Sequence, residues 1–394
     1  MTTGPGAPPG AEDIERFSRG EPISVEVDSI ERELRNLWQE ASRAGEHKDE
    51  ALSRAALWNL VVPTRGGALL TRTKRVLAEL APRLPSRAIV LAEQADGPGG
   101  DDRIRATIES NVVSHAGARR VVSAEQITLA GPPGSDDRFA ALVRALLIPG
   151  LPTATLWIDA TMPEGALVSE IMPLTDRLIV DTGSCGRPGR LPDVQRLADA
   201  RGRGHLADLG WLRLATYRQL FAGLFDPPVG GAPLARARRV TIEHRAGADV
   251  SALLLVAWLG LQLGWRPIAA LTGADGGLGF RFERTGTAAA GPQQGPIDLT
   301  LAPGPGACGT SGMIGVELHA ASPGGGDDQR YVVRRTADGH AELALPIAPP
   351  RVVKLDSRSD AELCAVALGP AGRDPLFPRC LEYAADLCRL ASHG

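Results

Sequence analysis

The chain has 394 residues, 43% of them hydrophobic, and a formal net charge of −3, which suits two domains with ordinary buried cores. Because the net charge is small, bulk electrostatics indicate neither a nucleic-acid partner nor an acidic membrane surface. The first residues lack the basic and apolar segments of a secretory leader, and the longest apolar run, residues 252–261, is about half the ~20 residues of a membrane span. We therefore expect a soluble, cytoplasmic protein.

The first half of the chain alternates between segments typical of strands and of helices. Residues 1–20 are expected to be disordered. Strands are then expected at 23–27, 57–62, 87–91, 104–108, 154–158 and 177–180, and helices at 28–43, 68–80, 135–148 and 191–200. Apolar strands that are buried on both faces and alternate with helices indicate a doubly wound, mostly parallel α/β sheet. We assign this domain to residues 21–228.

The second half has a different pattern, in which one strongly apolar helix at 248–263 is followed by many short strands. The strands are expected at 239–243, 267–271, 279–284, 297–302, 314–320, 331–335 and 341–345, and two further helices at 360–367 and 377–390. This order predicts an α+β C-terminal domain with an antiparallel sheet, residues 234–394. The boundary between the two domains is placed near residues 227–233.

The segment 208–228 concentrates aromatic residues in a chain whose aromatic content is only 4%. Apolar side chains recur there at spacings of three and four, which predicts one helical face: Trp211, Leu214, Tyr217, Phe221 and Leu224. Arg213 and Arg218 project away from that face, and Asp226-Pro227-Pro228 ends the helix.

Trp, Tyr and Arg side chains supply much of the binding energy in protein interfaces, because they combine large area with a directional polar group. On this ground the candidate partner-binding residues are Trp157, Trp211, Arg213, Tyr217 and Arg218. For each of them, packing within the fold is the alternative explanation.

A turn with the sequence Asp181-Thr182-Gly183-Ser184 follows an apolar strand and resembles the catalytic turn of aspartic proteases. That chemistry needs two carboxylates that share a proton, and the chain has no second Asp-Thr-Gly or Asp-Ser-Gly. A structural turn is the favoured interpretation, with Gly183 permitting the bend and Ser184 or Thr182 bonded to the local backbone.

Other chemical motifs are weak or absent. Residues 304–309 fit the pattern GxGxxG, but a strand is expected after them where the dinucleotide fingerprint needs a helix. The cysteines have no zinc spacing and are expected to be buried or idle thiols: Cys185, Cys308, Cys364, Cys380 and Cys388. We expect no cofactor and no metal, and the lack of an assembled catalytic set favours a binding function over an enzyme.

Seven short motifs, all in the right order, resemble the glucose-6-phosphate dehydrogenase assembly protein family (OpcA). They are WNLVV at 58–62, LPSRAIVL at 84–91, SAEQI at 123–127, LPTATLW at 151–157, DRLIVD at 176–181, DLGWLRLATYRQLFAGLFDPP at 208–228 and WLGLQLGW at 258–265. The chain departs from the family pattern at Gly150 and at the single Trp157. The match is clear between residues 57 and 265 and weak over 266–394.

The resemblance implies a non-catalytic assembly factor and activator of glucose-6-phosphate dehydrogenase, in the oxidative pentose phosphate pathway. Such a protein would bind the enzyme, stabilise its active oligomer and raise its apparent substrate affinity. The residues also leave open an α/β enzyme or sugar-phosphate-binding protein, with a site around Asp181 at the carboxyl ends of the strands. The aspartic protease is the third hypothesis.

Overall fold

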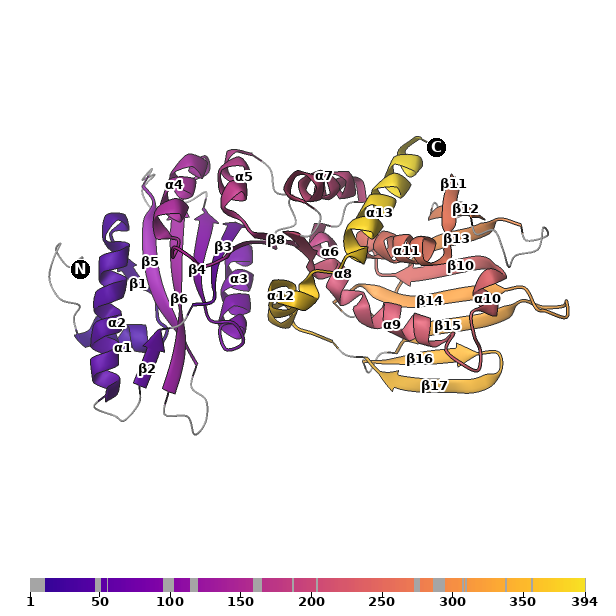
Figure 1. Cartoon of the computed structure of the whole chain (residues 1–394), viewed down its shortest axis with the longest axis horizontal. Coiled ribbons are helices and arrows are strands. Elements are labelled where there is room, and N and C mark those ends of the chain that lie inside the picture. The colour runs from indigo at the N-terminus through magenta and orange to yellow at the C-terminus, as the bar shows by residue number, and fades with distance from the viewer. Residues whose placement is uncertain are drawn as a thin grey trace. The chain divides into compact units, whose positions relative to one another are not determined.

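The computed structural model consists of two compact units (Figure 1). Unit 1 holds Met1–Val180 and Asp360–Gly372, and unit 2 holds Asp181–Ser359 and Arg373–Gly394. The structure describes residues 11–46, 51–54, 56–94, 103–113, 120–158, 165–185, 188–202, 205–272, 277–285, 295–306, 308, 310–336, 339–355 and 357–393. In these ranges no helix is both long enough and apolar enough to cross a membrane.

Unit 1 is built around one large sheet. Its strands are β1 (Ile23–Val25), β2 (Ala51–Arg54), β3 (Trp58–Arg65), β4 (Ser86–Glu93), β5 (Arg105–Val113), β6 (Arg120–Gly131), β7 (Thr153–Trp157) and β8 (Arg177–Val180). Its helices are α1 (Ala11–Ser18), α2 (Ile30–Glu46), α3 (Gly67–Leu80), α4 (Asp136–Leu146), α5 (Ala166–Ile171) and α12 (Asp360–Leu368).

The sheet of unit 1 is doubly wound, as predicted. Its strands run in the order β1-β5-β6-β4-β3-β7-β8, with β2 beside β6. The pairs from β6 to β8 are parallel, and β5 and β1 add an antiparallel edge. After β3 the chain adds β4 and β6 on one side of that strand, and it later adds β7 and β8 on the other side. The strand order therefore reverses at β3. This reversal is the topological switch point of a doubly wound fold.

Burial on both faces explains the apolar runs within strands such as β3 and β4. Val61 and Ile89 are register partners on one face and belong to the core that also contains residues of α2 and α4. Leu60 and Val62 alternate with them, are fully buried, and lie on the opposite side of the sheet. Helices therefore cover both faces of the sheet.

Two of the motifs that carry the family resemblance meet in a buried ion pair. Arg87 on β4 and Glu125 on β6 are register partners, and the Arg87 guanidinium binds the Glu125 carboxylate with both side chains almost fully buried. Trp38 Nε1 on α2 donates to Glu125 Oε2 at 3.1 Å. The pair thus ties a helix to the centre of the sheet, and it needs its partners because an unpaired charge in that position would be costly.

Helix α1 lies in the stretch that was expected to be disordered. The prediction of disorder is wrong for Ala11–Ser18, because Phe17 is fully buried there and makes an edge-on ring contact with Trp38 at 5.3 Å. The Gly- and Pro-rich sequence around this helix indicated disorder, and Phe17 alone is too weak a signal to predict the helix. Residues 1–10 lie outside the described residues.

Unit 2 contains a second large sheet. Its strands are β10 (Ala237–His244), β11 (Trp265–Thr272), β12 (Leu278–Arg284), β13 (Ile297–Pro303), β14 (Met313–Ala320), β15 (Gln329–Arg335), β16 (His340–Leu345) and β17 (Ala348–Lys354). The short strand β9 (Leu206–Asp208) also lies in this unit but is not part of that sheet. Its helices are α6 (Thr182–Cys185), α7 (Leu191–Arg201), α8 (Leu209–Arg213), α9 (Ala215–Gly223), α10 (Ala232–Ala235), α11 (Asp249–Leu263) and α13 (Leu376–His393).

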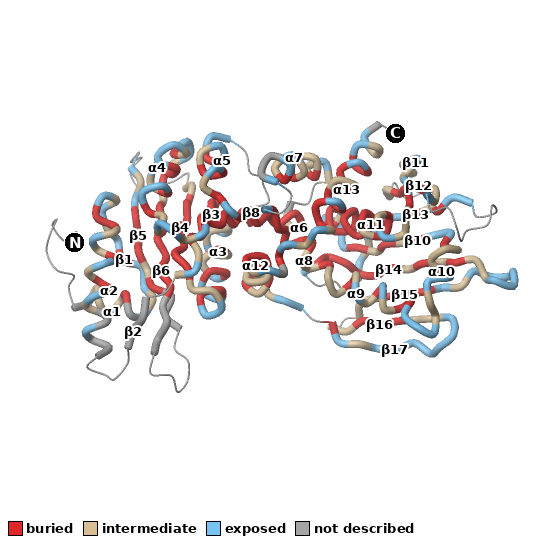
Figure 2. Tube along the Cα trace, in the orientation of Figure 1, coloured by how far each residue is buried: buried red, intermediate tan, exposed pale blue. Residues whose placement is uncertain are grey.

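The sheet of unit 2 confirms the predicted α+β class of the second half. Its order is β11-β12-β13-β10-β14-β15-β16-β17, and every pair is antiparallel except β10 with β13. The apolar helix α11 is buried on almost all sides (Figure 2). Strand β17 was missed, because Pro349 and Pro350 break the strand pattern in a segment that is nevertheless paired with β16.

The segment 208–228 forms two helices where one was predicted. Helix α8 ends at Arg213 and α9 begins at Ala215. The expected apolar face is present, since all five of its side chains are buried. The units defined by contacts divide the chain after Val180, whereas the sequence places the boundary near residues 227–233. A division by contacts does not test domains as folding units, so the boundaries 21–228 and 234–394 stay predictions.

Helices α11 and α13 pack closely at Gly260, and this contact gives a testable prediction. A Cβ atom on Gly260 would lie 2.4 Å from the Tyr383 hydroxyl, which donates to the Trp265 carbonyl at 2.6 Å. We expect Gly260→Ala to lower the free energy of unfolding by about 1–3 kcal/mol, the usual cost of overpacking, although alanine favours a helix more than glycine does. Urea unfolding measures the change.

Gly67 provides the matched control for that substitution. It is also helical, but a Cβ atom there would meet nothing within 4 Å. Gly67→Ala is therefore expected to leave stability unchanged or raise it by about 0.5–1 kcal/mol. If both variants were as stable as the unchanged protein, the close packing of α11 on α13 would be wrong.

Candidate functional site

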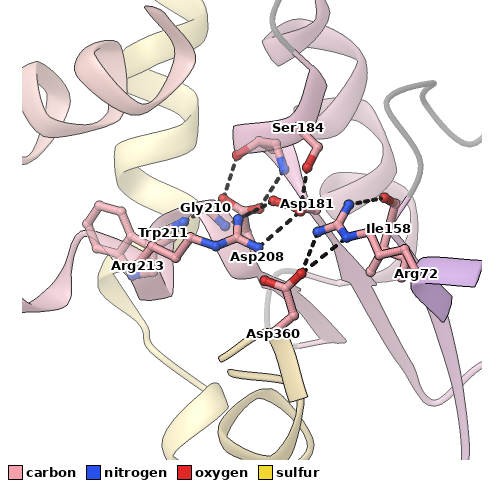
Figure 3. A network of polar contacts seen from close by, with 10 residues as sticks. Arg72, Ile158, Asp181, Ser184, Asp208, Gly210, Trp211, Arg213 and Asp360 are labelled. Carbon is pink, nitrogen blue, oxygen red and sulfur yellow. Dashed lines mark hydrogen bonds and ion pairs between the residues drawn. The ribbon is translucent and has the colours of Figure 1, made fainter. Parts of the chain in front are cut away.

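The turn that follows β8 is held by an ion pair that the sequence did not reveal. Arg213 Nη1 and Nη2 lie 2.5 and 3.1 Å from Asp181 Oδ1 and Oδ2, and Ser184 Oγ donates to Asp181 Oδ2 at 2.6 Å (Figure 3). The side chains of Asp181 and Arg213 are 0% and 6% exposed. A bidentate pair of this kind is strong and directional, so the Asp181 carboxylate is occupied by a structural contact.

A second buried carboxylate, Asp208, connects the same turn to helix α8. Its side chain accepts from the Thr182 backbone N–H and hydroxyl at 2.8 and 2.6 Å, and it caps α8 by accepting from the N–H groups of Gly210 and Trp211 at 3.2 and 2.9 Å. Complete burial raises the pKa of Asp208 to about 6, although these hydrogen bonds favour the charged form. Asp208 is therefore an N-cap that joins two segments of the chain.

The hydroxyls of the turn bond to carboxylates and not to the local backbone as predicted. Thr182 Oγ1 donates to Asp208 and Ser184 Oγ donates to Asp181. A protease dyad would need two aspartates at this turn, and the nearest pair among the described residues is Asp181 and Asp208. Both are about 1% exposed, and Asp181 is paired with Arg213. Neither carboxylate is placed to reach a substrate from solvent, which disfavours the protease hypothesis.

Trp211 and Arg218 form a stacked pair in unit 2. The Arg218 guanidinium carbon lies 3.4 Å from the centre of the Trp211 ring, and its Nη1 donates to the Trp211 carbonyl at 3.2 Å. Trp211 Nε1 donates to Asp374 Oδ2 at 2.8 Å, and that oxygen is 3.9 Å from Arg218 Nη2. Burial lowers the pKa of Arg218 to about 10. The cation–π contact and the shared carboxylate hold both side chains in place.

Tyr217 is a core residue whose hydroxyl is satisfied within unit 2. It is 2% exposed, and its hydroxyl donates to the Met313 carbonyl at 2.9 Å. Burial raises its pKa to about 12. Trp211, Arg213, Tyr217 and Arg218 are thus all buried or nearly so in this chain. Their contact with a partner stays a prediction, and what the structure adds is that each of them supports the fold.

Trp157 is the candidate residue in unit 1, and it lines a very small cavity near the switch point. The cavity has a volume of about 10 Å³, and its other lining residues include Thr64, Arg65, Glu93 and Asp136. This volume is about that of one water-sized sphere, whereas sites for small molecules need roughly 300 Å³ or more. The described residues therefore leave no room for a sugar phosphate beside Trp157.

Unit 1 has its own polar contact at the carboxyl end of β7, also drawn in Figure 3. Arg72 on α3 binds Asp360 on α12 at 2.7 Å and donates to the Ile158 carbonyl at 3.2 Å. A second ion pair, between Arg83 and Glu362 at 3.0 Å, lies along the same two helices. These contacts fasten the segment of the late chain that contains α12 to the rest of unit 1.

The possible metal ligands, the cysteines and the GxGxxG stretch form no assembled site in the described ranges. No group of three or more His, Cys, Asp or Glu side chains there could hold a metal ion. Burial raises the pKa of Cys380 to about 12 and of Cys388 to about 11, so both thiols stay protonated at neutral pH. Cys364 is also buried, Cys308 is partly buried, and the side chain of Cys185 lies outside the described residues. The GxGxxG stretch is followed by strand β14, as expected.

The chain matches two family models that lie in order along it. The model described as the glucose-6-phosphate dehydrogenase subunit N-terminal domain matches residues 78–197, and the one described as the C-terminal domain matches residues 204–381. These ranges include the segments in which most of the resemblance was found, and they extend into the region 266–394, where the motifs were weak.

Curated relatives carry the corresponding name. The OxPP cycle protein OpcA of Nostoc punctiforme is 32% identical over 197 residues, which cover 50% of this chain and 41% of the relative. The chain thus spans about two fifths of that relative's length. The OxPP cycle protein OpcA of Synechocystis sp. is 23% identical over 367 residues, 84% of this chain and 72% of the relative.

Solved structures with a similar course of the chain are more distant. A levoglucosan dehydrogenase in complex with NADH and L-sorbose aligns with a TM-score of 0.46 and 11% identity over 85% of this chain and 96% of that one. An oxidoreductase from Sinorhizobium meliloti aligns with a TM-score of 0.43 and 14% identity, covering 84% of this chain and 88% of the other.

Proposed function

This chain belongs to the OpcA family, whose models are described as glucose-6-phosphate dehydrogenase subunit domains, and on that premise we propose that it binds glucose-6-phosphate dehydrogenase and activates it without catalysing a reaction itself. The single observation that carries the proposal is the ordered match of both family models over residues 78–197 and 204–381. The names of the relatives place those proteins in the oxidative pentose phosphate cycle.

The buried polar network supports a role in binding more than one in catalysis. Asp181 and Asp208 are about 1% exposed, and their oxygens are bonded to Arg213, Ser184 and Thr182. General acid–base chemistry needs a group within reach of a substrate proton. In the described residues, these carboxylates hold a turn and cap a helix. A sugar-phosphate site beside Trp157 is not supported either, since the cavity there is about 10 Å³.

The proposed mechanism is linkage between binding and the oligomeric state of the enzyme. A partner that binds the active oligomer more tightly than the inactive form shifts the population towards the active one by its difference in affinity. A tenfold activation needs a difference of only ~1.4 kcal/mol. Such a shift requires a stable, specific surface, and it requires no bond to be made or broken by the activator.

The test is an activity titration with glucose-6-phosphate dehydrogenase from the same organism. We expect activity to rise and saturate as this protein is added, with a lower KM for glucose-6-phosphate and no turnover by this protein alone. The heat-denatured protein at the same concentration is the control. A flat titration, together with separate elution of the two proteins on size exclusion, would contradict the proposal.

A further inference from the structure

The sheet of unit 2 has one face covered by helices and one face without a helix among the described residues. On the covered face, Val240, Leu318 and Tyr331 are successive register partners and all are buried. Phe225, just after α9, contacts Tyr331 at 5.1 Å between ring centres, and α11 packs on β10. Because side chains alternate along a strand, their neighbours in sequence point to the opposite face.

Most side chains of that opposite face around β10 and β14 are polar. Thr241 on β10 is the register partner of Thr300 on β13 and of Glu317 on β14. We call it the open face and define it by Asp298, Thr300, Thr241, Glu317, Arg330 and Arg334. Its charges are paired across neighbouring strands: Arg330 Nε and Nη2 each lie 2.7 Å from Glu317, and Arg281 Nε lies 2.7 Å from Asp298.

The two edges of this sheet are poorly suited to pairing with another strand. The edge strand β11 contains Pro267, with an irregular register just after it, and the other edge strand β17 contains Pro349 and Pro350. Proline has no N–H to donate, and bulges turn an edge away from a partner. Association through this sheet would therefore use its open face.

The charges of the open face are complementary to themselves. The centre of the eight-stranded order lies between β10 and β14. A second copy can be related to the first by a two-fold axis that runs parallel to the strands between β10 and β14. Strand β13 then lies opposite β15 of the second copy, and β12 lies opposite its β16. Asp298 then faces the basic Arg330 of the second copy, because both lie in the same row of register partners as Arg239 and His319, and Thr241 faces its Glu317. Self-complementarity of this kind is what an isologous dimer requires.

The area of the open face is also sufficient. Neighbouring strands lie about 4.8 Å apart and each residue advances the chain by about 3.3 Å, so eight strands of about seven residues present roughly 900 Å². A standard protein interface buries about 800 Å² on each partner. The open face alone could therefore supply one side of a specific interface.

We propose that a second copy of this chain binds the open face, so that two copies form a two-fold symmetric dimer with their unit 2 sheets face to face. The polar character of the surface makes the dimer sensitive to salt, because exposed charges are screened at high ionic strength. The inference concerns the chain itself and stands apart from its proposed partner enzyme.

Thr300 offers the sharpest test, because it is exposed on β13 and faces the basic strand β15 of the second copy in this arrangement. We expect the unchanged protein to be dimeric by size exclusion with light scattering. Thr300→Arg places like charges against each other and should weaken the dimer at least tenfold, whereas Thr300→Glu should preserve or strengthen it. Gln219→Arg, on the exposed side of α9, is the control for added charge and should remain dimeric.

A salt series on the unchanged protein keeps the test independent of any variant. We expect the dimer to dissociate more readily at 1 M than at 0.1 M salt, since the Debye length falls from about 10 to about 3 Å over that range. A monomer at every soluble concentration would overturn the proposal. So would a dimer that Thr300→Arg and Thr300→Glu leave equally stable.

Discussion

Replacing Arg213 by alanine is expected to lower the free energy of unfolding by about 3–5 kcal/mol, the usual cost of leaving one member of a buried ion pair without its partner. Asp181 is 0% exposed in its side chain and Arg213 is 6% exposed, with a closest contact of 2.5 Å. Removing the guanidinium leaves a carboxylate in the protein interior that water cannot solvate. Equilibrium unfolding in urea, followed by circular dichroism, measures the loss.

Replacing both Asp181 and Arg213 by neutral residues separates the effect of charge on stability from the effect of packing. The double variant Asp181→Asn with Arg213→Gln removes both charges and keeps polar groups of similar size in place. It should recover a large part of the stability lost in Arg213→Ala, because no uncompensated charge remains. If Arg213→Ala alone were within ~0.5 kcal/mol of the unchanged protein, the buried pair would not form in solution.

Replacing Asp208 by alanine is expected to cost about 2–4 kcal/mol. The substitution removes the cap of α8 and leaves the donors of Thr182, Gly210 and Trp211 without their acceptor. Loss of the N-cap bonds to Gly210 and Trp211 costs about 1 kcal/mol, and leaving the buried Thr182 N–H without an acceptor costs about 1–3 kcal/mol more. Thermal and urea unfolding of the variant check the value.

Asp208→Asn is the matched control, and it also tests the pKa of this group. The folded-state pKa of about 6 lies above the usual 3.8, so Asp208 contributes stability that is fully present below about pH 4 and is lost as the pH rises through about 6. The asparagine variant lacks this dependence. The unchanged protein should therefore lose stability relative to Asp208→Asn between pH 4 and pH 7. A constant difference across that range would contradict the burial of a titrating carboxylate.

Much of the fold could be read from local patterns. Strand β4 is buried on both faces and contains an apolar run at residues 88–92, and α2 shows its buried face through Ile30, Leu34 and Trp38. Strand β17 could not be found in this way, because Pro349 and Pro350 make it look like a loop and only its pairing with β16 makes it a strand.

The contacts of the candidate site were harder to anticipate, because they join residues that are distant in the chain. Arg213 and Asp181 are separated by 32 positions, and Trp211 and Asp374 by 163. No spacing rule predicts such partners. Asp208 is different, since an aspartate directly before a helix is a common N-cap, and this signal was available in the sequence. The aromatic and arginine content of the segment predicts an interface, which stays a prediction, and in the structure the same side chains also pack within unit 2.

The central claim is that this protein changes the population of an enzyme's oligomers by binding, and the most direct test measures those oligomers. Mass photometry of glucose-6-phosphate dehydrogenase from the same organism, with this protein titrated in, reports their distribution while activity is measured in parallel. The account predicts a shift to one larger species that contains both proteins, with the same midpoint as the rise in activity. An unchanged distribution, or activation at concentrations where no complex forms, would contradict it.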